Sequence, residues 1–280
     1  MRRPGTLAIV VLVLLLPAAA AAADPQAWRQ RPNSEAAEII NDDITEEVRF
    51  GREVAARIIG RYGLYANNGM TRYVTLVGQS LAHNANRPEL TFRFAVLNTA
   101  EINGYACPGG YIFVTRGAIE KMQDESELAG VIAHEMIHVN ERHVVNELNI
   151  KATEASPAAG LARLIGGSTD AARAAFSQSV DKAVDTLFRT GYKREDESSA
   201  DRGAVSLAAV AGYDPAGLVR YFERIGAVKG SKTTEVLDKT HPAYDARIAL
   251  LKETMARDGI DSSAFRTNKE RFSEAVKQIK

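Results

Sequence analysis

Cysteine is almost missing from this sequence, which excludes a fold held together by disulfides. Cys107 is the only cysteine among the 280 residues, so it cannot form a disulfide within the chain. It also lies far from the expected signal cleavage site near the N-terminus, which argues against a lipid anchor on this residue. We expect Cys107 to be a small buried residue, with a catalytic thiol as the alternative.

An excess of charge of either sign is missing too. The chain has 35 basic and 35 acidic residues, and its formal net charge at pH 7 is zero. Since no basic stripe is present, phosphate groups have no electrostatic footprint to bind, and we expect no nucleic-acid partner. The ordinary apolar fraction and the lack of internal repeats indicate one domain with a substantial core.

Long apolar runs are missing beyond the start of the chain. There, residues 1–3 are Met-Arg-Arg, residues 7–16 are apolar, and an alanine tract ends at Ala23. This run is too short to cross a bilayer, and the small residues before Asp24 form a cleavage site, so residues 1–23 are predicted to be a secretory signal peptide. The paired arginines resemble a twin-arginine signal, but the residues after them fit it poorly and favour ordinary secretion. We expect a mature chain without a transmembrane span, located in a bacterial periplasm.

Histidine is scarce as well, yet three of the five histidines lie within residues 134–143. Apolar residues cover nearly all sides of the segment 128–139, which predicts a buried helix. Asp124 can cap the start of this helix while Glu127 reaches back, and the acidic run 124–127 suits the positive end of the helix dipole.

Two of these histidines have the spacing of a metal site. Residues four apart on a helix lie about 40° apart in projection, so His134 and His138 point to one place, where they can bind zinc. Glu135 lies beside them, close enough to accept a proton from a water without being a ligand, as in the HExxH arrangement of zinc peptidases. The alternative is a pair of hydrogen-bonded core histidines.

The third ligand has to come from elsewhere. His143 would lie about 180° around a continuous helix from His134, so we expect it to be a structural residue near the helix end. Glu197 and Asp201 share one face of a helix predicted to run towards Ala211, and small alanines continue that face. We predict that Glu197 ligates zinc and that Asp201 accepts a hydrogen bond from the other nitrogen of His134. The alternative is a solvated run of charge.

Four motifs resemble one family, the zinc metallopeptidases that include HtpX, BepA and the CaaX prenyl endopeptidases. Residues 134–143 read HEMIHVNERH, similar to the HExxHxxxRH run of the family, and residues 197–201 read ESSAD, similar to its ExxAD. Residues 103–115 resemble its NAxxxPGGxIFV segment, and residues 240–242 with Arg247 resemble its HPxxxxR. The resemblance covers about residues 42–257. It implies an α+β fold, mostly helical and gluzincin-type, with a small β-sheet and the HExxH helix at its centre, but no tetratricopeptide tail.

A strand that binds substrate is also implied by the resemblance. Residues 91–97 and 111–114 read as strands, and residues 108–110 form the turn between the second strand and the segment before it. The resemblance places a sheet edge that binds extended substrate at this segment, with the residues Asn103, Gly104, Tyr105 and Ala106. The alternative is an ordinary hairpin. Gly104 departs from the usual alanine of the family, which puts the local strand in doubt.

The remaining segments are assigned by pattern and by turn residues. An extended N-terminal segment covers 24–41, and the catalytic domain covers 42–280. Helices are predicted at about 42–60, 71–83, 215–225, 243–257 and 262–278. Residues 151–182, rich in Ala, Gly and Ser, are expected to form broken helices and either a connector or a lid. His83 is expected at the surface.

Together these residues predict a zinc-dependent endopeptidase of the cell envelope, holding one zinc ion per chain and acting on unfolded or misassembled envelope proteins. Zinc held by the three ligands would polarise the scissile carbonyl, and Glu135 would take a proton from water and give it to the leaving amine. Two alternatives are an envelope chaperone with secondary proteolysis and a zinc enzyme acting on a non-peptide bond. Glu135 argues against a purely binding role, which needs no general base.

His241 is the other predicted catalytic residue. Pro242 restricts its backbone and turns the chain into the next helix. His241 could stabilise the oxyanion of the transition state, or it could bind the zinc in the resting enzyme and keep the protease latent. A helix-capping histidine without a catalytic role is the third reading.

Overall fold

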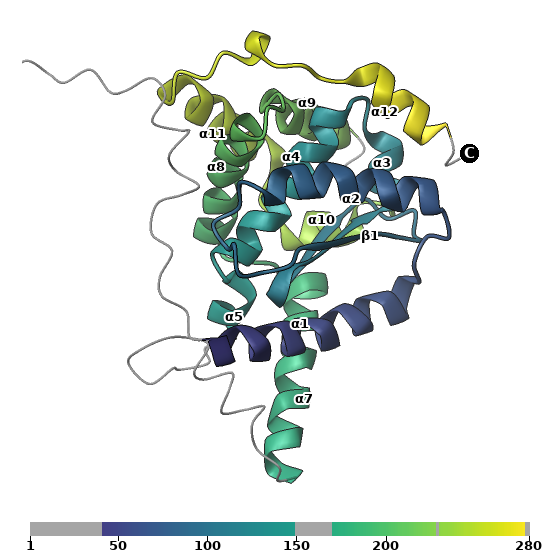
Figure 1. Ribbon diagram of the computed structural model, residues 1–280, viewed down its shortest axis with the longest axis vertical. Coiled ribbons are helices and arrows are strands. Elements are labelled where there is room, and N and C mark those ends of the chain that lie inside the picture. Colours follow the sequence, from purple (N-terminus) through teal and green to yellow (C-terminus); the bar gives the residue numbers. More distant parts are fainter. Residues whose placement is uncertain (1–40, 149–169, 228–229, 278–280) are drawn as a thin grey trace, which may run out of the picture.

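The computed structural model describes residues 41–148, 170–227 and 230–277 (Figure 1). In these ranges the chain is mostly helical with a small three-stranded sheet, and the α+β prediction is confirmed. The predicted signal peptide and nearly all of the extended N-terminal segment lie outside the described residues and stay predictions. Within the described ranges, no helix is both long and apolar enough to span a bilayer.

The sheet has the order β1-β3-β2, with one parallel and one antiparallel pair. Its strands are β1 (Arg93–Leu97), β2 (Gly104–Cys107) and β3 (Tyr111–Thr115). The tight turn η3 (Pro108–Gly110) joins β2 to β3, and Gly109 there has a φ of 71°, which favours glycine. The strand that was in doubt because of a glycine is therefore formed, and it lies at a sheet edge.

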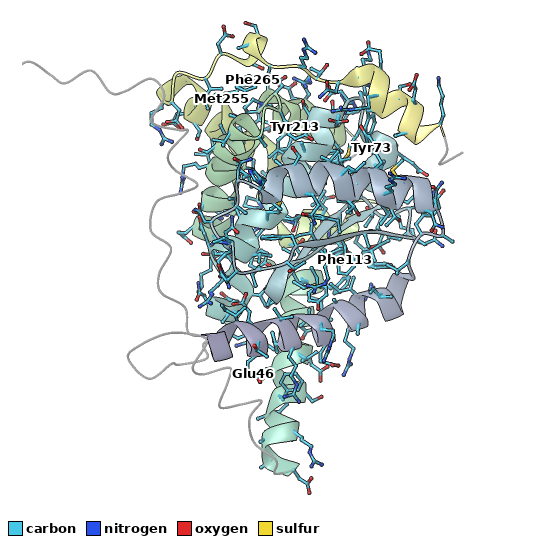
Figure 2. All side chains as sticks on the ribbon, in the orientation of Figure 1. Glu46, Tyr73, Phe113, Tyr213, Met255 and Phe265 are labelled. Atoms are coloured by element: carbon cyan, nitrogen blue, oxygen red, sulfur yellow. The ribbon has the colours of Figure 1, made fainter. Side chains whose placement is uncertain are left out.

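Alternation along the strands divides the core into two layers. One face of the sheet packs against α1 (Asn41–Tyr62) through Tyr105, Cys107 and Phe113, which share a buried cluster with Phe50. Figure 2 shows Phe113 in this layer beside α1. The other face contributes to a second cluster with α2 (Asn68–Ala82) and the central helices, through the residues Phe94, Val96, Ile112 and Val114.

The predicted central helix is α4 (Glu125–Asn140), which lies among the other helices (Figure 1). It is buried along its whole length except at Asn140. Asp124 caps it by accepting the Glu127 N–H at 3.0 Å, as expected. Glu127 does reach back, but to the Gln123 N–H at 2.9 Å, one residue before the cap. The first four N–H groups of a helix have no partner within the helix. Asp124 accepts one of them, and Glu127 accepts the N–H of Gln123, which precedes the helix.

Small residues bring α4 close to its main neighbour, α8 (Arg194–Val210). The predicted alanine face of α8 is buried against the core at Ala200, Ala204 and Ala208. On another side α4 packs against α9 (Ala216–Gly226), which starts after the Asp214-Pro215 turn as expected, because Asp214 accepts the Ala216 N–H at 3.0 Å. The other described helices include α3 (Arg116–Lys121), α5 (His143–Glu147), α10 (Glu235–Thr240) and α11 (Tyr244–Arg257).

The prediction of broken helices across 151–182 is wrong for its second half. Residues 151–169 lie outside the described ranges, but α7 (Asp170–Asp185) is one unbroken helix that ends in the π-helical turn η4 (Thr186–Thr190). Its apolar residues recur at helical spacing and pack on α1, as the Phe176 and Phe50 rings do with centroids 5.8 Å apart. The alanines that suggested broken helices are good helix formers once such a face is buried.

The predicted helix over 262–278 is also corrected. The structure has a 3₁₀ turn, η5 (Ser262–Ala264), and a short helix, α12 (Lys269–Val276). Between them the chain is extended because it docks on the start of α4. There the Thr267 carbonyl accepts the N–H groups of Glu125 and Ser126. This tertiary contact has no signal in the local apolar pattern.

Candidate metal centre

Three predicted ligand side chains meet at the centre of the molecule. His134 and His138 come from α4 and Glu197 from the first turn of α8, and one ligand atom of each lies within 4.8 Å of the others. The two histidine Nε2 atoms are 3.0 Å apart. Glu197 Oε2 lies 3.7 Å from His134 Nε2, and Glu197 Oε1 lies 3.5 Å from His138 Nε2.

These distances fit a tetrahedral zinc site. Bonds of about 2.0–2.1 Å to zinc place two ligand atoms about 3.3 Å apart, between the values seen here. All three side chains are buried. Glu197 Oε1 is a buried atom without a hydrogen-bond partner among the described residues, so a lone pair on this oxygen is left for a cation.

The charges around Glu197 favour its ionised form. Burial acts to raise the pKa of this carboxyl, but the neighbouring His241 and Arg247 outweigh it and leave the pKa well below its usual range. Burial, together with repulsion from His134, holds the pKa of His138 well below its ordinary value. Burial and the charge of Arg247 lower the pKa of His134. A carboxylate and two neutral imidazoles are the forms that bind zinc.

Asp201 and His134 make the expected contact. Asp201 Oδ1 lies 3.0 Å from His134 Nδ1, so that nitrogen can donate its hydrogen while Nε2 faces the other ligands. The Arg247 guanidinium, from α11, donates to both oxygens of Asp201 at 2.7 and 2.9 Å. Arg247 Nη2 also lies 3.2 Å from His134 Nδ1. The guanidinium carbon lies 4.2 Å from the centroid of the Phe222 ring, on which it stacks. The sequence placed Arg247 in the HPxxxxR motif but did not predict that it contacts Asp201.

His143 does not lie where a continuous helix would put it. Helix α4 ends at Asn140, and Arg142 takes the left-handed conformation with a φ of 56°, which turns the chain back. As a result, His143 Nδ1 comes within 2.8 Å of His138 Nδ1, and its Nε2 lies 3.0 Å from Glu141 Oε2. His143 thus contacts the nitrogen of His138 that points away from the other ligands, a role that helix geometry alone could not reveal.

Glu135 lies beside the three ligands and against strand β2. Its side chain is 5% exposed, and a Cβ built on Gly104 would come within 2.6 Å of its Oε1. The glycine therefore gives the carboxylate its room. Burial, together with the charge of Glu197, raises the pKa of Glu135 to about 8. A cavity of about 30 Å³ adjoins Glu135 and His134, and its apolar wall includes Val131, Leu218, Tyr221, Phe222, Ile225 and Leu237.

The predicted catalytic residue His241 is within reach of the centre. It follows α10, and its Nδ1 lies 2.7 Å from Glu197 Oε2. Its ring centroid is 5.9 Å from that of His134. Two polar residues follow His241 in the chain. The Tyr244 hydroxyl donates to Asp238 at 3.2 Å, and Arg247 pairs with Asp201.

Tyr192 is a residue that sequence reasoning missed. Its ring stacks on His138 with centroids 4.1 Å apart and planes 16° from parallel. Its hydroxyl is buried and has no hydrogen-bond partner in the described part of the chain. Just before it, Phe188 of η4 packs against Tyr105 of β2 with centroids 5.0 Å apart, so this segment lies over the predicted substrate strand. No local motif marks either residue, because both act through contacts between distant segments.

Comparisons with known proteins show sequence similarity over most of this chain. The profile described as Peptidase family M48 matches residues 69–255. The chain is 26% identical over 224 residues to the beta-barrel assembly-enhancing protease of Escherichia coli (strain K12), which covers 74% of this chain and 43% of that protein. It is 31% identical over 217 residues to the putative beta-barrel assembly-enhancing protease of Vibrio cholerae, covering 75% of this chain and 44% of that protein.

A shorter relative matches over more of its own length. The metalloprotease LoiP of Escherichia coli (strain K12) is 26% identical over 196 residues, covering 70% of this chain and 74% of that protein. By contrast, the chain spans less than half the length of the two assembly-enhancing proteases.

Proposed function

Because this chain belongs to peptidase family M48 and is a metallopeptidase of that family, we propose that it hydrolyses peptide bonds within polypeptides with one zinc ion. The observation that carries the proposal is the meeting of His134, His138 and Glu197 beside Glu135. A protein that only bound polypeptides would not need the buried carboxylate of Glu135 beside the three ligands. Burying an isolated carboxylate costs free energy. A bound zinc ion would polarise the scissile carbonyl and lower the pKa of a water towards about 7.

The chain's own residues then move the proton. Glu135 accepts it from the attacking water on a carboxylate oxygen and delivers it to the nitrogen of the leaving amine. Burial raises the pKa of Glu135, so its carboxylate holds a proton more tightly than that of an exposed glutamate. Asp201 holds the hydrogen on His134 Nδ1, and His143 accepts the hydrogen on His138 Nδ1, so that both Nε2 lone pairs face the cluster.

Strand β2 offers the surface for substrate. It lies at the edge of the sheet, and Asn103 and Gly104 border the cavity beside Glu135. An extended peptide could pair with the main chain of residues 103–106 and present its scissile bond to the zinc site. Unfolded chains are the substrates that fit, because only an extended segment can add to a sheet edge.

The envelope is the proposed place of action. Relatives are named for enhancing β-barrel assembly, and barrels of this kind are built into outer membranes. Misassembled or unfolded envelope proteins are therefore the proposed substrates.

The test of the activity is incubation of casein with the wild type, the chelated wild type and Glu135→Gln. Cleavage by the untreated wild type alone supports the proposal, whereas binding of casein without cleavage would favour the chaperone.

Export can be tested separately. If residues 1–23 are a signal peptide, protein recovered from the periplasmic fraction should begin at Asp24, and intact-mass spectrometry measures this. An N-terminus still at Met1, or retention in washed inner membranes, would contradict the proposed location.

His241→Ala should change the rate of casein cleavage, and the sign of the change identifies the role. If His241 donates to the oxyanion, the rate should fall by roughly a hundredfold, as for other lost oxyanion donors. If His241 instead binds the zinc in the resting enzyme and keeps it latent, the rate should rise; its Nδ1 lies 2.7 Å from Glu197 Oε2. The measurement is kcat with zinc content determined in parallel. A wild-type rate with full zinc would remove His241 from the mechanism. Tyr192, whose buried hydroxyl has no hydrogen-bond partner among the described residues, would become the next donor to test.

A further inference from the structure

A buried ion cluster lies at the C-terminal end of α4, where Arg87 donates to the Val139 carbonyl at 3.4 Å. At its centre is Glu47 of α1, which is 1% exposed. Its Oε1 accepts the Gly109 N–H at 3.2 Å and Arg87 Nη1 at 3.3 Å. Its Oε2 accepts Arg87 Nη2 at 3.1 Å and lies 3.1 Å from Arg142 Nε. One carboxylate thus joins four segments that are distant in sequence.

Two of these segments belong to the proposed active site. Arg142 is the left-handed residue that ends α4 and returns His143 towards His138. Gly109 is the left-handed residue of the turn after strand β2, the proposed substrate strand. Because non-glycine residues rarely adopt positive φ, the conformation of Arg142 has to be held by its contacts. Glu47 supplies a buried charged contact to it.

We propose that Glu47 is a positioning residue of the metal centre, acting through Arg142 to hold His143 against His138. The inference rests on the proposed function, since it concerns the zinc site. The matched region of the family begins at residue 69, so Glu47 contributes from a helix outside it. The hydrogen bonds and ion pairs described for Glu47 go to Arg87, Gly109 and Arg142, and none of these residues is a proposed ligand. Its effect is on the orientation of His138 Nε2, which depends on the hydrogen bond at Nδ1.

The test is the zinc affinity of Glu47→Gln, measured by competition with a chromophoric chelator. Residues that orient a metal ligand change affinity by roughly 10- to 100-fold when replaced, and we expect about a tenfold loss here. Glu53→Gln is the matched control, because it removes a carboxylate from the exposed side of the same helix. Its zinc affinity should match that of the wild type. Equal affinity in Glu47→Gln and the wild type would overturn the inference.

A general loosening of α1 has to be told apart from this specific route. Val54→Ala weakens the fully buried face of α1 without touching the ion cluster, and its zinc affinity should stay within about twofold of the wild type. In a second comparison, Glu47→Gln is combined with Arg142→Met. If Glu47 acts through Arg142, the double variant should bind zinc about as weakly as Arg142→Met alone. Additive losses would overturn the route through Arg142.

Glu47→Gln leaves two buried guanidinium groups facing a neutral amide, and it can fail to fold. Arg142→Lys keeps the charge but loses the directed guanidinium, and circular dichroism would establish that it is folded. Weaker zinc binding by this folded variant supports the inference, and unchanged binding overturns it. A wild type that binds no zinc at all would instead overturn the proposed function.

Discussion

Glu135→Gln is expected to bind one zinc ion per chain and to cleave casein at least 100-fold more slowly than the wild type. Glutamine has nearly the same shape but cannot accept a proton, and a lost general base costs roughly 10²- to 10⁴-fold in rate. Zinc should stay because Glu135 lies next to the ligand cluster without belonging to it. Elemental analysis and a cleavage assay on the same preparation measure both quantities.

The ligand variants should show the opposite pattern. His134→Ala, His138→Ala and Glu197→Ala each remove one of three ligands and should lose both zinc and activity. Glu223→Gln, which alters an exposed carboxylate paired with Lys252, is the matched control and should keep both. Full zinc in Glu197→Ala would refute the third ligand, and wild-type cleavage by Glu135→Gln would refute the general base.

Features that depend on local spacing could be predicted from the sequence. The helix of His134 and His138 was predicted from its apolar pattern and the cap at Asp124, and both are set within a few turns. Glu197 and Asp201 could be paired because residues four apart share a helix face. Likewise, residues 108–110 marked the turn between β2 and β3.

Features that depend on contacts between distant segments could not. Arg142, which makes the turn, pairs with Glu47 of α1 at 3.1 Å, and Glu47 belongs to no motif. Without that turn, helix geometry sends His143 to the wrong side. Tyr192 reaches His138 only because η4 folds over β2. The predicted C-terminal helix is interrupted because Thr267 bonds to the start of α4. In each case the deciding partner is remote in sequence, so no local pattern records it.

Arg247→Met is expected to lower the free energy of unfolding by about 3–5 kcal/mol, because removal of one partner leaves a buried charge uncompensated. Asp201 is 0% exposed and Arg247 is 3% exposed, so water cannot replace the lost contact. Burial acts to lower the pKa of Arg247, but the adjacent Asp201 outweighs it and raises the pKa above its usual range. The pair is therefore charged at neutral pH. Methionine keeps an apolar stem at this position but loses the guanidinium that lies 4.2 Å from the centroid of the Phe222 ring.

Urea unfolding of the chelated proteins is the measurement, because bound zinc would add its own stabilisation to the wild type. Lys252→Met is the matched control, since it breaks an exposed pair with Glu223 at 2.9 Å and should cost under about 1 kcal/mol. Asp201→Asn combined with Arg247→Met removes both charges and should regain part of the loss, because the uncompensated carboxylate is gone. If Arg247→Met lowers the free energy of unfolding by less than about 1 kcal/mol, the hydrogen bond from His134 is enough to stabilise the buried Asp201 carboxylate. Arg247 would then have no part in holding His134 in place.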